Sequence, residues 1–304
     1  MIVIAVAHVL LALLLAPLLP GVINRTKAAL AGRRGQPLLQ AYFDLGKLLR
    51  KDVVYSTTTT WVFRAGPGAA LAATLVAIVI LAFANARGLL AFPGDLLLFA
   101  YLLGLARFAL VVAALDTGSS FEGMGASREV TISALAEPAL LLGLVAMARE
   151  AGSLSLSDVY TRLAPVSLVE GGGPALLLVA AAFGVVYLAE NARIPFDDPN
   201  THLELTMIHE VMILDHSGPD LAFLQYGAAL KLWLLGSLVV GILIPLHGAP
   251  PVLAMLGGLA GMFMLAVVTG VVESTMARLR LVRVPQLLVG AALLSLLALL
   301  MVLA

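Results

Sequence analysis

The chain has 304 residues, of which 61% are hydrophobic and only 12% are charged, and its mean hydropathy is +1.05. Its 18 basic and 18 acidic residues cancel, so the overall charge gives no reason to expect a nucleic acid partner. This composition excludes an ordinary soluble domain and predicts a single integral membrane domain, residues 1–304, surrounded by membrane lipid.

The absence of cysteine excludes disulfides, thiolate-held iron–sulfur clusters and thiol catalysis in this chain. Any redox centre must therefore lie on another chain or be held by histidine. We expect no cofactor and no metal here.

Apolar runs long enough to cross a bilayer, which takes roughly 20 residues, occur about eight times along the sequence. They predict an all-α, polytopic membrane protein with spans at 2–20, 67–85, 96–115, 131–149, 174–191, 223–245, 251–273 and 284–303. Basic residues follow the first run instead of preceding it, which favours a retained span over a cleaved signal peptide. Glu137-Pro138 interrupts the fourth run, but membrane helices tolerate proline when neighbouring helices satisfy the freed carbonyl.

Eight spans place both termini on one side, and the basic residues then indicate which side that is. The loops on one side carry 13 lysines and arginines, whereas those on the other carry only three, Arg87, Arg149 and Arg162. The positive-inside rule therefore places the charged loops in the cytoplasm and both termini outside a bacterial or archaeal cytoplasmic membrane.

The first cytoplasmic loop contains an amphipathic segment. Apolar residues at helical spacing, Leu38, Tyr42, Leu45 and Leu49, alternate with a polar set, Gln40, Asp44, Lys47 and Lys51. We expect an amphipathic surface helix that lies at the membrane surface or against a partner. The simpler alternative is an interfacial helix whose basic residues face lipid phosphates.

The segment ENARIPFDDPNTHLELTMIHE, residues 190–210, concentrates ionisable groups in an otherwise apolar chain. Asp198-Pro199 predicts that the fifth span ends near Asn191, kinks through 194–197 and restarts as a helix from about Pro199. Apolar neighbours surround Glu204 and Glu210 on that helix. We therefore expect it to be packed on all sides.

Carboxylates in apolar surroundings gain protons more readily, so Glu190, Glu204 and Glu210 are candidates for proton exchange. Arg107 and Glu137 lie inside predicted spans, where ionisable groups generally belong to ion or proton paths. The alternative is structural: Arg193 pairs with Glu190 and the other acids face the cytoplasm. For Lys231, in the sixth span, we expect snorkelling or an ion pair with an acid.

Three histidines, His202, His209 and His216, are spaced by seven and would share one face of a continuous helix. They cannot form one metal site, because seven residues rise about 10.5 Å along a helix. Haem ligation is disfavoured because His8 and His247 fall near the outer boundaries of spans. We predict polar contacts with a cytoplasmic partner, or a place for His209 in a proton relay.

Several stretches resemble a known family: RRGQPLLQAYFDLGKLLRKD, GASREVTISALAEP, ENARIPFDDPNTHLELTMIHEVMILDHSGPD and RLRLVRVPQ. They are similar to the membrane subunit shared by complex I, where it forms the mouth of the quinone chamber, and by the group 4 energy-converting nickel–iron hydrogenases, including formate hydrogenlyase and hydrogenase-4. The complex I loop has a Glu-rich stretch ending in Glu-Tyr, whereas this chain has DPNTH and, later, LDH. The departure looks like the hydrogenase branch.

The resemblance implies an acidic path and a set of supporting residues. The implied path comprises Glu137, Glu190, Asp197, Asp198, Glu204 and Glu210, to which the position of Arg107 inside a span adds that residue. Arg193 would hold the bend, and residues that stabilise the loop or face a partner would include Arg128, Asp215, His216, Arg278, Arg280 and Arg283. The implied partners are a nickel–iron large subunit, a small subunit with an iron–sulfur cluster, and antiporter-like membrane subunits.

The leading hypothesis is a non-catalytic anchor and coupling subunit that links electron transfer in a peripheral hydrogenase arm to proton or ion movement through buried carboxylates. A quinone-site subunit of a complex I-like NADH dehydrogenase is the alternative within the same superfamily. A stand-alone ion-coupled transporter is a third hypothesis, disfavoured because the sequence shows no inverted repeat. A scaffold with inert acids is the fourth.

Overall fold

Long apolar helices make up most of the chain. The computed structural model describes residues 2–84, 86–163, 172–197, 207–244, 246 and 248–304. Within these ranges there is no strand, only an isolated bridge between Phe83 and Ala86. The helices are α1 (Ile2–Leu15), α2 (Leu18–Leu30), α3 (Gln40–Leu48), α4 (Trp61–Ile80), α5 (Asp95–Asp116), α6 (Ser120–Ala151), α7 (Leu156–Arg162), α8 (Gly173–Glu190), α9 (His209–Met212), α10 (Gly218–Leu243), α11 (Pro251–Thr275), the 3-10 turn η1 (Leu281–Arg283) and α12 (Val284–Leu303).

The predicted number of spans is confirmed. In the described part of the chain, seven helices are long and apolar enough to cross a membrane, and the bent pair α1 and α2 makes an eighth. The two helices of this pair meet at 49°, next to Pro17. Proline removes a backbone donor and clashes with the preceding turn, which accounts for a sharp bend at this point.

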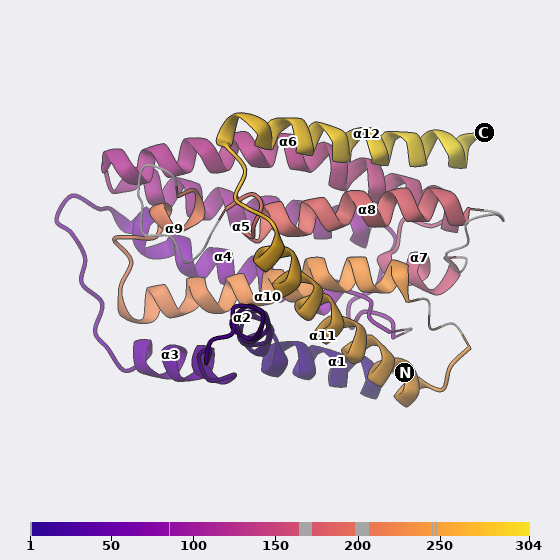
Figure 1. Ribbon diagram of the computed structural model, residues 1–304, viewed down its shortest axis with the longest axis horizontal. Helices are drawn as coiled ribbons and strands as arrows, with labels where there is room; N and C mark the ends of the chain where they lie inside the picture. The colour runs from indigo at the N-terminus through magenta and orange to yellow at the C-terminus, as the bar shows by residue number, and fades with distance from the viewer. Residues whose placement is uncertain (1, 85, 164–171, 198–206, 245, 247) are drawn as a thin grey trace.

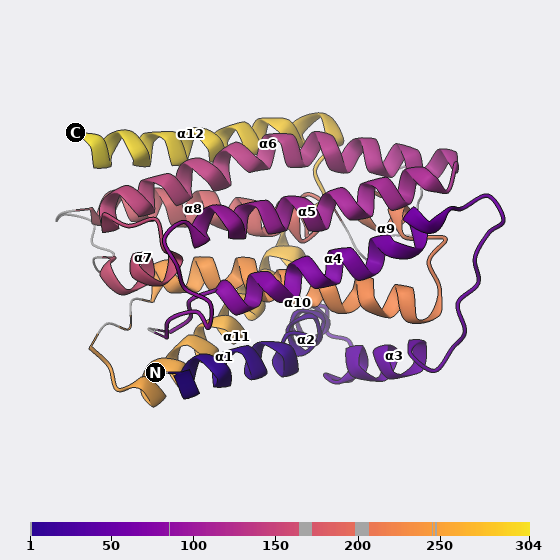
Figure 2. The same cartoon turned by 180° about the vertical axis from the view of Figure 1, so that it is seen from behind.

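The spans run side by side, and the two ends of the chain lie at the same end of the bundle (Figures 1 and 2). Both termini and α7 lie at one end, which we call the terminal end. The opposite end carries α9 and the basic linker that follows α3, and we call it the charged end (Figure 1). The expectation that both termini lie together, opposite the charged loops, therefore holds.

The fourth span is longer than predicted. α6 has 32 residues and begins at Ser120, so it includes most of the predicted loop 116–130. Pro138 lies inside it without ending it, as expected. Ser295 of α12 donates a hydrogen bond of 2.7 Å to the carbonyl of Ala139, where α6 and α12 pack together. Because α6 extends beyond the apolar run, charged residues of the predicted loop belong to this helix instead.

The helices differ in how far they reach toward the charged end. Figure 1 shows α8 and α11 ending before the level that α6 and α10 reach. α8 has 18 residues, against 32 for α6 and 26 for α10. A core that includes the fully buried Trp233 and Leu144 joins the spans. Polar residues at the ends of α8 and α11 are therefore enclosed by longer neighbours.

The predicted amphipathic segment forms α3. None of its residues is buried, and it lies against α2 and α10. The Tyr42 hydroxyl donates a hydrogen bond to the carbonyl of Leu14, which ties α3 to the first span. Leu38 also closely approaches Gly21, where a Cβ would stand 2.2 Å from the Leu38 carbonyl oxygen. Glycine is required at this crossing.

Candidate functional site

The site begins where α8 ends. The amide of Arg193 donates to the carbonyl of Leu188 and that of Ala192 to Ala189, which is the hydrogen-bond pattern of a Schellman cap. Ala192 takes the left-handed conformation, with φ of 49°, a position that usually belongs to glycine. This strained turn directs Glu190 and Arg193 to opposite sides of the same junction. The predicted end of the fifth span near Asn191 is confirmed.

An unbroken chain of ion pairs crosses four helices at this level. Arg107 of α5 donates to Glu137 of α6 at 2.5 Å and to Glu190 of α8 at 2.7 Å. Lys231 of α10 lies 2.8 Å from the other oxygen of Glu190. The Glu190 side chain is 5% exposed and that of Arg107 is 10% exposed, whereas Glu137 is 48% exposed. The chain therefore runs from a sheltered carboxylate to one on the surface of α6.

A second cluster lies where α11 ends. Glu273 has a side-chain exposure of 0% and pairs with Lys27 of α2 at 2.7 Å and with Arg193 at 3.4 Å. Burying a carboxylate without a partner costs several kcal/mol, so the two cations are what permits its position. Glu273 thereby links α2, α11 and the turn after α8.

A third set of contacts holds the residues at the start of α9. Asp197, which is 1% exposed, pairs with Arg278 at 2.8 Å. Its Oδ2 atom also accepts hydrogen bonds from the amides of Ile208 and His209, at 3.0 and 3.2 Å. Arg128 donates to the carbonyl of Met207 at 2.9 Å. These contacts fix α9 above the ion pairs.

The packing of α9 on α6 requires glycine at position 125. A Cβ there would stand 2.2 Å from the Val211 side chain and 3.1 Å from the Ile208 carbonyl oxygen. Nearby, the buried Glu122 accepts a hydrogen bond of 3.0 Å from the amide of Asp215. The residues between Met207 and Asp215 are therefore held to α6 by packing and by charge.

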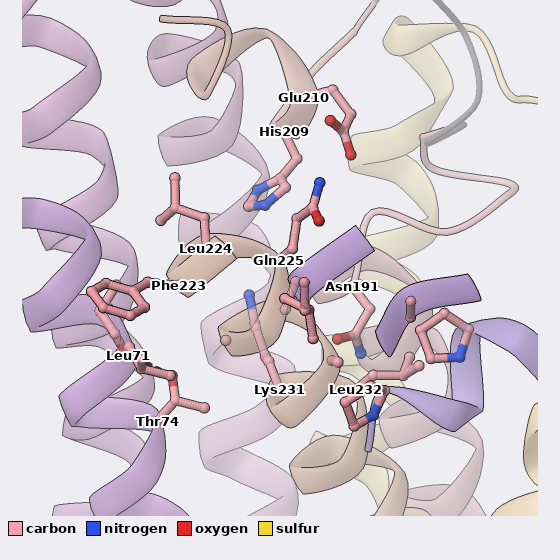
Figure 3. A pocket seen from close by; sticks show the side chains of 18 of the residues that line it. Leu71, Thr74, Asn191, His209, Glu210, Phe223, Leu224, Gln225, Lys231 and Leu232 are labelled. Atoms are coloured by element: carbon pink, nitrogen blue, oxygen red, sulfur yellow. Dashed lines mark hydrogen bonds between the residues drawn. The ribbon is translucent and has the colours of Figure 1, made fainter. Parts of the chain in front are cut away.

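A cavity of about 340 Å³ opens between α2, α3, α4, α5, α8, α9 and α10. Its floor contains Arg107, Glu190 and Lys231, and its wall on the α9 side contains His209 and Glu210. Figure 3 shows Asn191, His209, Gln225 and Lys231 around this space. A cavity of this size with charged walls admits water, so the ion-pair chain has a polar connection toward the charged end.

His216, between α9 and α10 in the chain, is buried against Phe63 of α4. Its ring stacks on Phe63 with centroids 4.0 Å apart and planes 5° apart, and the residue is 4% exposed. Burial lowers the pKa of His216 from 6.5 to about 4, because the charged imidazolium loses its hydration. The histidine is therefore neutral at pH 7.

This lowered pKa predicts a loss of stability in mild acid. The unfolded chain takes up a proton on His216 below about pH 6.5, whereas the folded chain does so only near pH 4. With respect to His216, the free energy of unfolding is therefore highest above pH 6.5. It falls between pH 6.5 and 4 by about 1.4 kcal/mol per pH unit. Thermal unfolding of the His216→Phe variant should show a shallower dependence over this interval than the wild type; equal slopes would contradict the assignment.

The structure brings together much of the predicted acidic path. Glu137, Glu190 and Arg107 form one chain of ion pairs, and Glu210 and His209 line the cavity above it. The expectation that Lys231 pairs with an acid is also confirmed. Asp198, His202 and Glu204 lie outside the described residues.

The pairing assumed in the structural alternative is wrong. Arg193 does not pair with Glu190, because the turn at Ala192 carries it toward Glu273. The helix predicted from Pro199 lies mostly outside the described residues. A continuous helix as far as His216, the condition for the three histidines to share a face, is excluded, because Met207 and Ile208 are not helical and α9 is only four residues long. The amides of Ile208 and His209 donate to Asp197.

Other predicted residues lie at the charged end in varied surroundings. Asp215, Arg280 and Arg283 are exposed there, whereas His216 is buried. Arg128 and Arg278 contact the segment around α9. Within the described part of the chain, no group of three or more histidine, aspartate or glutamate side chains has an arrangement suited to a metal ion.

Sequence reasoning missed Lys27 and Glu273 as site residues. Each lies beside the end of an apolar run, where a charge is ordinarily explained by contact with lipid headgroups or water. The only available signal was that Glu273 falls at the last position of the predicted seventh span, where a carboxylate needs a partner. The identity of the cation that pairs with Glu273 depended on the packing of α2 against α11.

Comparisons with known proteins agree with this architecture. Residues 2–304 match the family model described as NADH dehydrogenase. Formate hydrogenlyase subunit 4 of Escherichia coli (strain K12) is 34% identical over 280 residues, covering 90% of this chain and 89% of the relative. Hydrogenase-4 component C of the same strain is 32% identical over 286 residues, covering 91% and 88%.

A solved structure has the same fold. It is that of the membrane-bound sulfane sulfur reductase, an archaeal respiratory membrane complex, with a TM-score of 0.83 over 99% of this chain and 98% of the matched chain, at 21% identity. The family match along the chain, the identity to two curated relatives and the shared fold lead to one conclusion: the chain belongs to the NADH dehydrogenase family of membrane subunits.

Proposed function

We propose that this protein is the membrane anchor and coupling subunit of a multi-subunit oxidoreductase, in which electron transfer in a peripheral nickel–iron hydrogenase arm drives proton movement through the buried carboxylates. The observation that carries the proposal is the chain of ion pairs from Glu137 through Arg107 and Glu190 to Lys231. The names of the curated relatives, a formate hydrogenlyase subunit and a hydrogenase-4 component, support the hydrogenase branch.

Coupling follows from the electrostatics of the site. Two carboxylates share Arg107, so a charge that appears near one of them changes the proton affinity of the other. The cavity connects this chain to α9 at the charged end, where an electron on a partner's cluster would act. Adding negative charge there favours protonation of Glu190 or Glu210, and removing it favours release.

The charged end is the proposed docking surface for the peripheral arm. Arg280, Arg283 and Asp215 are exposed there, close in sequence to segments that hold α9. By the positive-inside rule this end faces the cytoplasm and both termini face outside. The proposed partners are the hydrogenase large subunit, the small subunit with its iron–sulfur cluster, and antiporter-like membrane subunits. The nickel–iron centre and the clusters belong to those partners.

The test is the Glu137→Gln variant of the complex, in membranes. It removes a negative charge while preserving shape, and Glu137 is half exposed, so the fold should remain. We expect proton-coupled turnover to fall at least tenfold, whereas hydrogen oxidation with artificial dyes stays within twofold of the wild type. Glu204→Gln is expected to behave in the same way.

Asp158→Asn serves as the control, because Asp158 lies in α7 at the terminal end, where it pairs with Arg87 outside the ion-pair chain and away from the proposed docking surface. It should leave both activities unchanged. Proton-linked turnover at the wild-type level in Glu137→Gln would contradict the assignment of Glu137 to the path.

A quinone-site subunit is the second candidate function, favoured by the cavity. Its volume of about 340 Å³ and its lining of both apolar and charged side chains suit the head group of an amphiphilic quinone. In that case Leu71 and Phe223 would contact the ring or tail and His209 would meet the oxygens. Turnover that stops with quinone-site inhibitors would support this candidate. Insensitivity to them would support the hydrogenase branch.

A further inference from the structure

Glu129 is a carboxylate of the cavity that the ion-pair chain does not include. It belongs to the part of α6 that replaces the predicted loop 116–130, and it lines the cavity together with Arg107 and Glu190. The residue is partly buried, and no cation in the described part of the chain lies within ion-pair distance of it. Its carboxylate is therefore not committed to a partner and can exchange a proton with water in the cavity.

The place of Glu129 along α6 is intermediate between the wall and the floor of the cavity. One turn before it, Gly125 packs against the segment that contains α9. α9 carries Glu210 on the cavity wall (Figure 3). Eight residues after Glu129, or about 12 Å further along the helix, Glu137 pairs with Arg107. Glu129 thus lies between the packing site of α9 and the ion pairs.

The charge of Glu129 also acts on Arg107. The two side chains form no direct ion pair, but Glu129 stabilises the Arg107 cation through space, as Glu190 does by direct contact. Asp44 of α3 lines the same cavity, where it accepts a hydrogen bond of 2.8 Å from Gln40. Of these two carboxylates outside the ion-pair chain, Glu129 is the one whose charge reaches Arg107.

We propose that Glu129 carries the proton between Glu210 on the cavity wall and the ion pairs on the floor. The proton leaves the carboxyl group of Glu210 and reaches the Glu129 carboxylate through water in the cavity, which leaves Glu210 ionised. A second transfer, to Glu190, returns Glu129 to its ionised form. Each step moves one proton and breaks no bond between heavy atoms. This inference rests on the proposed function and adds a residue to it.

Arg107 accounts for why an acid at this position can serve the second transfer. When Glu129 is protonated, the ionised Glu190 neutralises Arg107 at 2.7 Å. When Glu190 is protonated, the ionised Glu129 still acts on the same cation. A buried charge without compensation costs several kcal/mol, so an exchange of charge between two acids around one cation avoids most of that cost. The proton can therefore pass without leaving Arg107 uncompensated.

The test uses the intact complex in membranes. E129Q removes the titratable group and preserves its shape, so proton-coupled turnover should fall by about tenfold or more, while hydrogen oxidation with artificial dyes stays within about twofold of the wild type. E129D keeps a carboxylate and should recover most of the coupled turnover. D44N is the matched control, because it removes a carboxylate from the same cavity, and both of its activities should stay at the wild-type level.

A second measurement reports protonation directly and would not respond to a purely structural role. Infrared difference spectra between the reduced and oxidised complex show the carbonyl stretch of a carboxyl group that gains or loses a proton, and this band shifts in D2O. The wild type should show such a band that E129Q lacks, whereas D44N should keep it. E129D should shift the band, which decides the question even if E129Q does not assemble.

Two results would overturn the proposal: coupled turnover of E129Q at the level of D44N, or infrared bands that neither E129Q nor E129D changes. The Glu137→Gln variant separates this failure from a failure of the proposed function. Loss of coupling in Glu137→Gln with normal coupling in E129Q would leave the proposed function standing without Glu129. Normal coupling in both variants would contradict the proposed path as well.

Discussion

Replacing Arg107 with methionine is expected to lower the free energy of unfolding by about 3–5 kcal/mol, the usual cost of removing one partner from a buried ion pair. Arg107 donates to both Glu137 and Glu190, and its side chain is only 10% exposed. Without it, Glu190 keeps Lys231 as its sole cation among the described residues. Unfolding of the detergent-solubilised complex by heat or denaturant, followed by fluorescence, measures the loss.

Arg64→Met is the matched control for Arg107→Met. Arg64 is exposed and lies 4.6 Å from the ring centroid of Tyr55, a contact expected to contribute about 0.5–1 kcal/mol. A double-mutant cycle with Glu190→Gln should show strong coupling, since the second change removes the charge that the first left short of partners. Equal losses for Arg107→Met and Arg64→Met would refute the buried ion-pair chain.

Changing Glu273 to glutamine is expected to destabilise the protein by a similar amount, about 3–5 kcal/mol. Its side chain is 0% exposed, and the change leaves both Lys27 and Arg193 without their acid. Lys27→Met should cost less, because Arg193 still neutralises Glu273 and because Lys27 is 22% exposed. The order of the two unfolding midpoints is the measurement.

For Glu273, the comparison variant is Asp215→Asn. The Asp215 side chain is exposed, so the change should stay within about 0.5 kcal/mol of the wild type. A Glu273→Gln protein as stable as Asp215→Asn would mean that the cluster of α2, α11 and the α8 turn contributes nothing to the fold.

The spans were predictable because apolar runs of sufficient length are a direct requirement of the bilayer. The first span was placed at 2–20, whereas α2 continues to Leu30, because Asn24, Arg25 and Lys27 look like the end of a span when their partners are unknown. α6 starts at Ser120 for the same reason: Glu122 and Arg128 have contacts with Asp215 and Met207 that only the folded chain supplies. Charged extensions of membrane helices therefore cannot be predicted from the local sequence, because they depend on contacts made only in the folded chain.

Apart from Lys27 and Glu273, the members of the site were predictable, whereas most of their pairing was not. Glu190, Glu137 and Arg107 stood out because an ionisable side chain inside an apolar run is costly to bury and usually has a function. Their partners depended on the rotation of each helix and on one turn, at Ala192, where alanine takes a conformation typical of glycine. That turn sends Arg193 to Glu273 and leaves Glu190 to Arg107 and Lys231. Neither pairing follows from spacing along the chain.

The short reach of α8 has a consequence for the response to membrane voltage. Glu190 is the last residue of α8 and its only acid or base, and beyond Lys231 the rest of α10 carries none. The terminal-end half of these helices is therefore an electrical insulator, across which most of the transmembrane potential falls. On the proposed path, a proton moving between Glu210 and Glu190 would cross only a small part of a drop that amounts to about 2.3 kcal/mol per charge and 100 mV. The proposed proton movement should thus respond to redox state far more than to voltage.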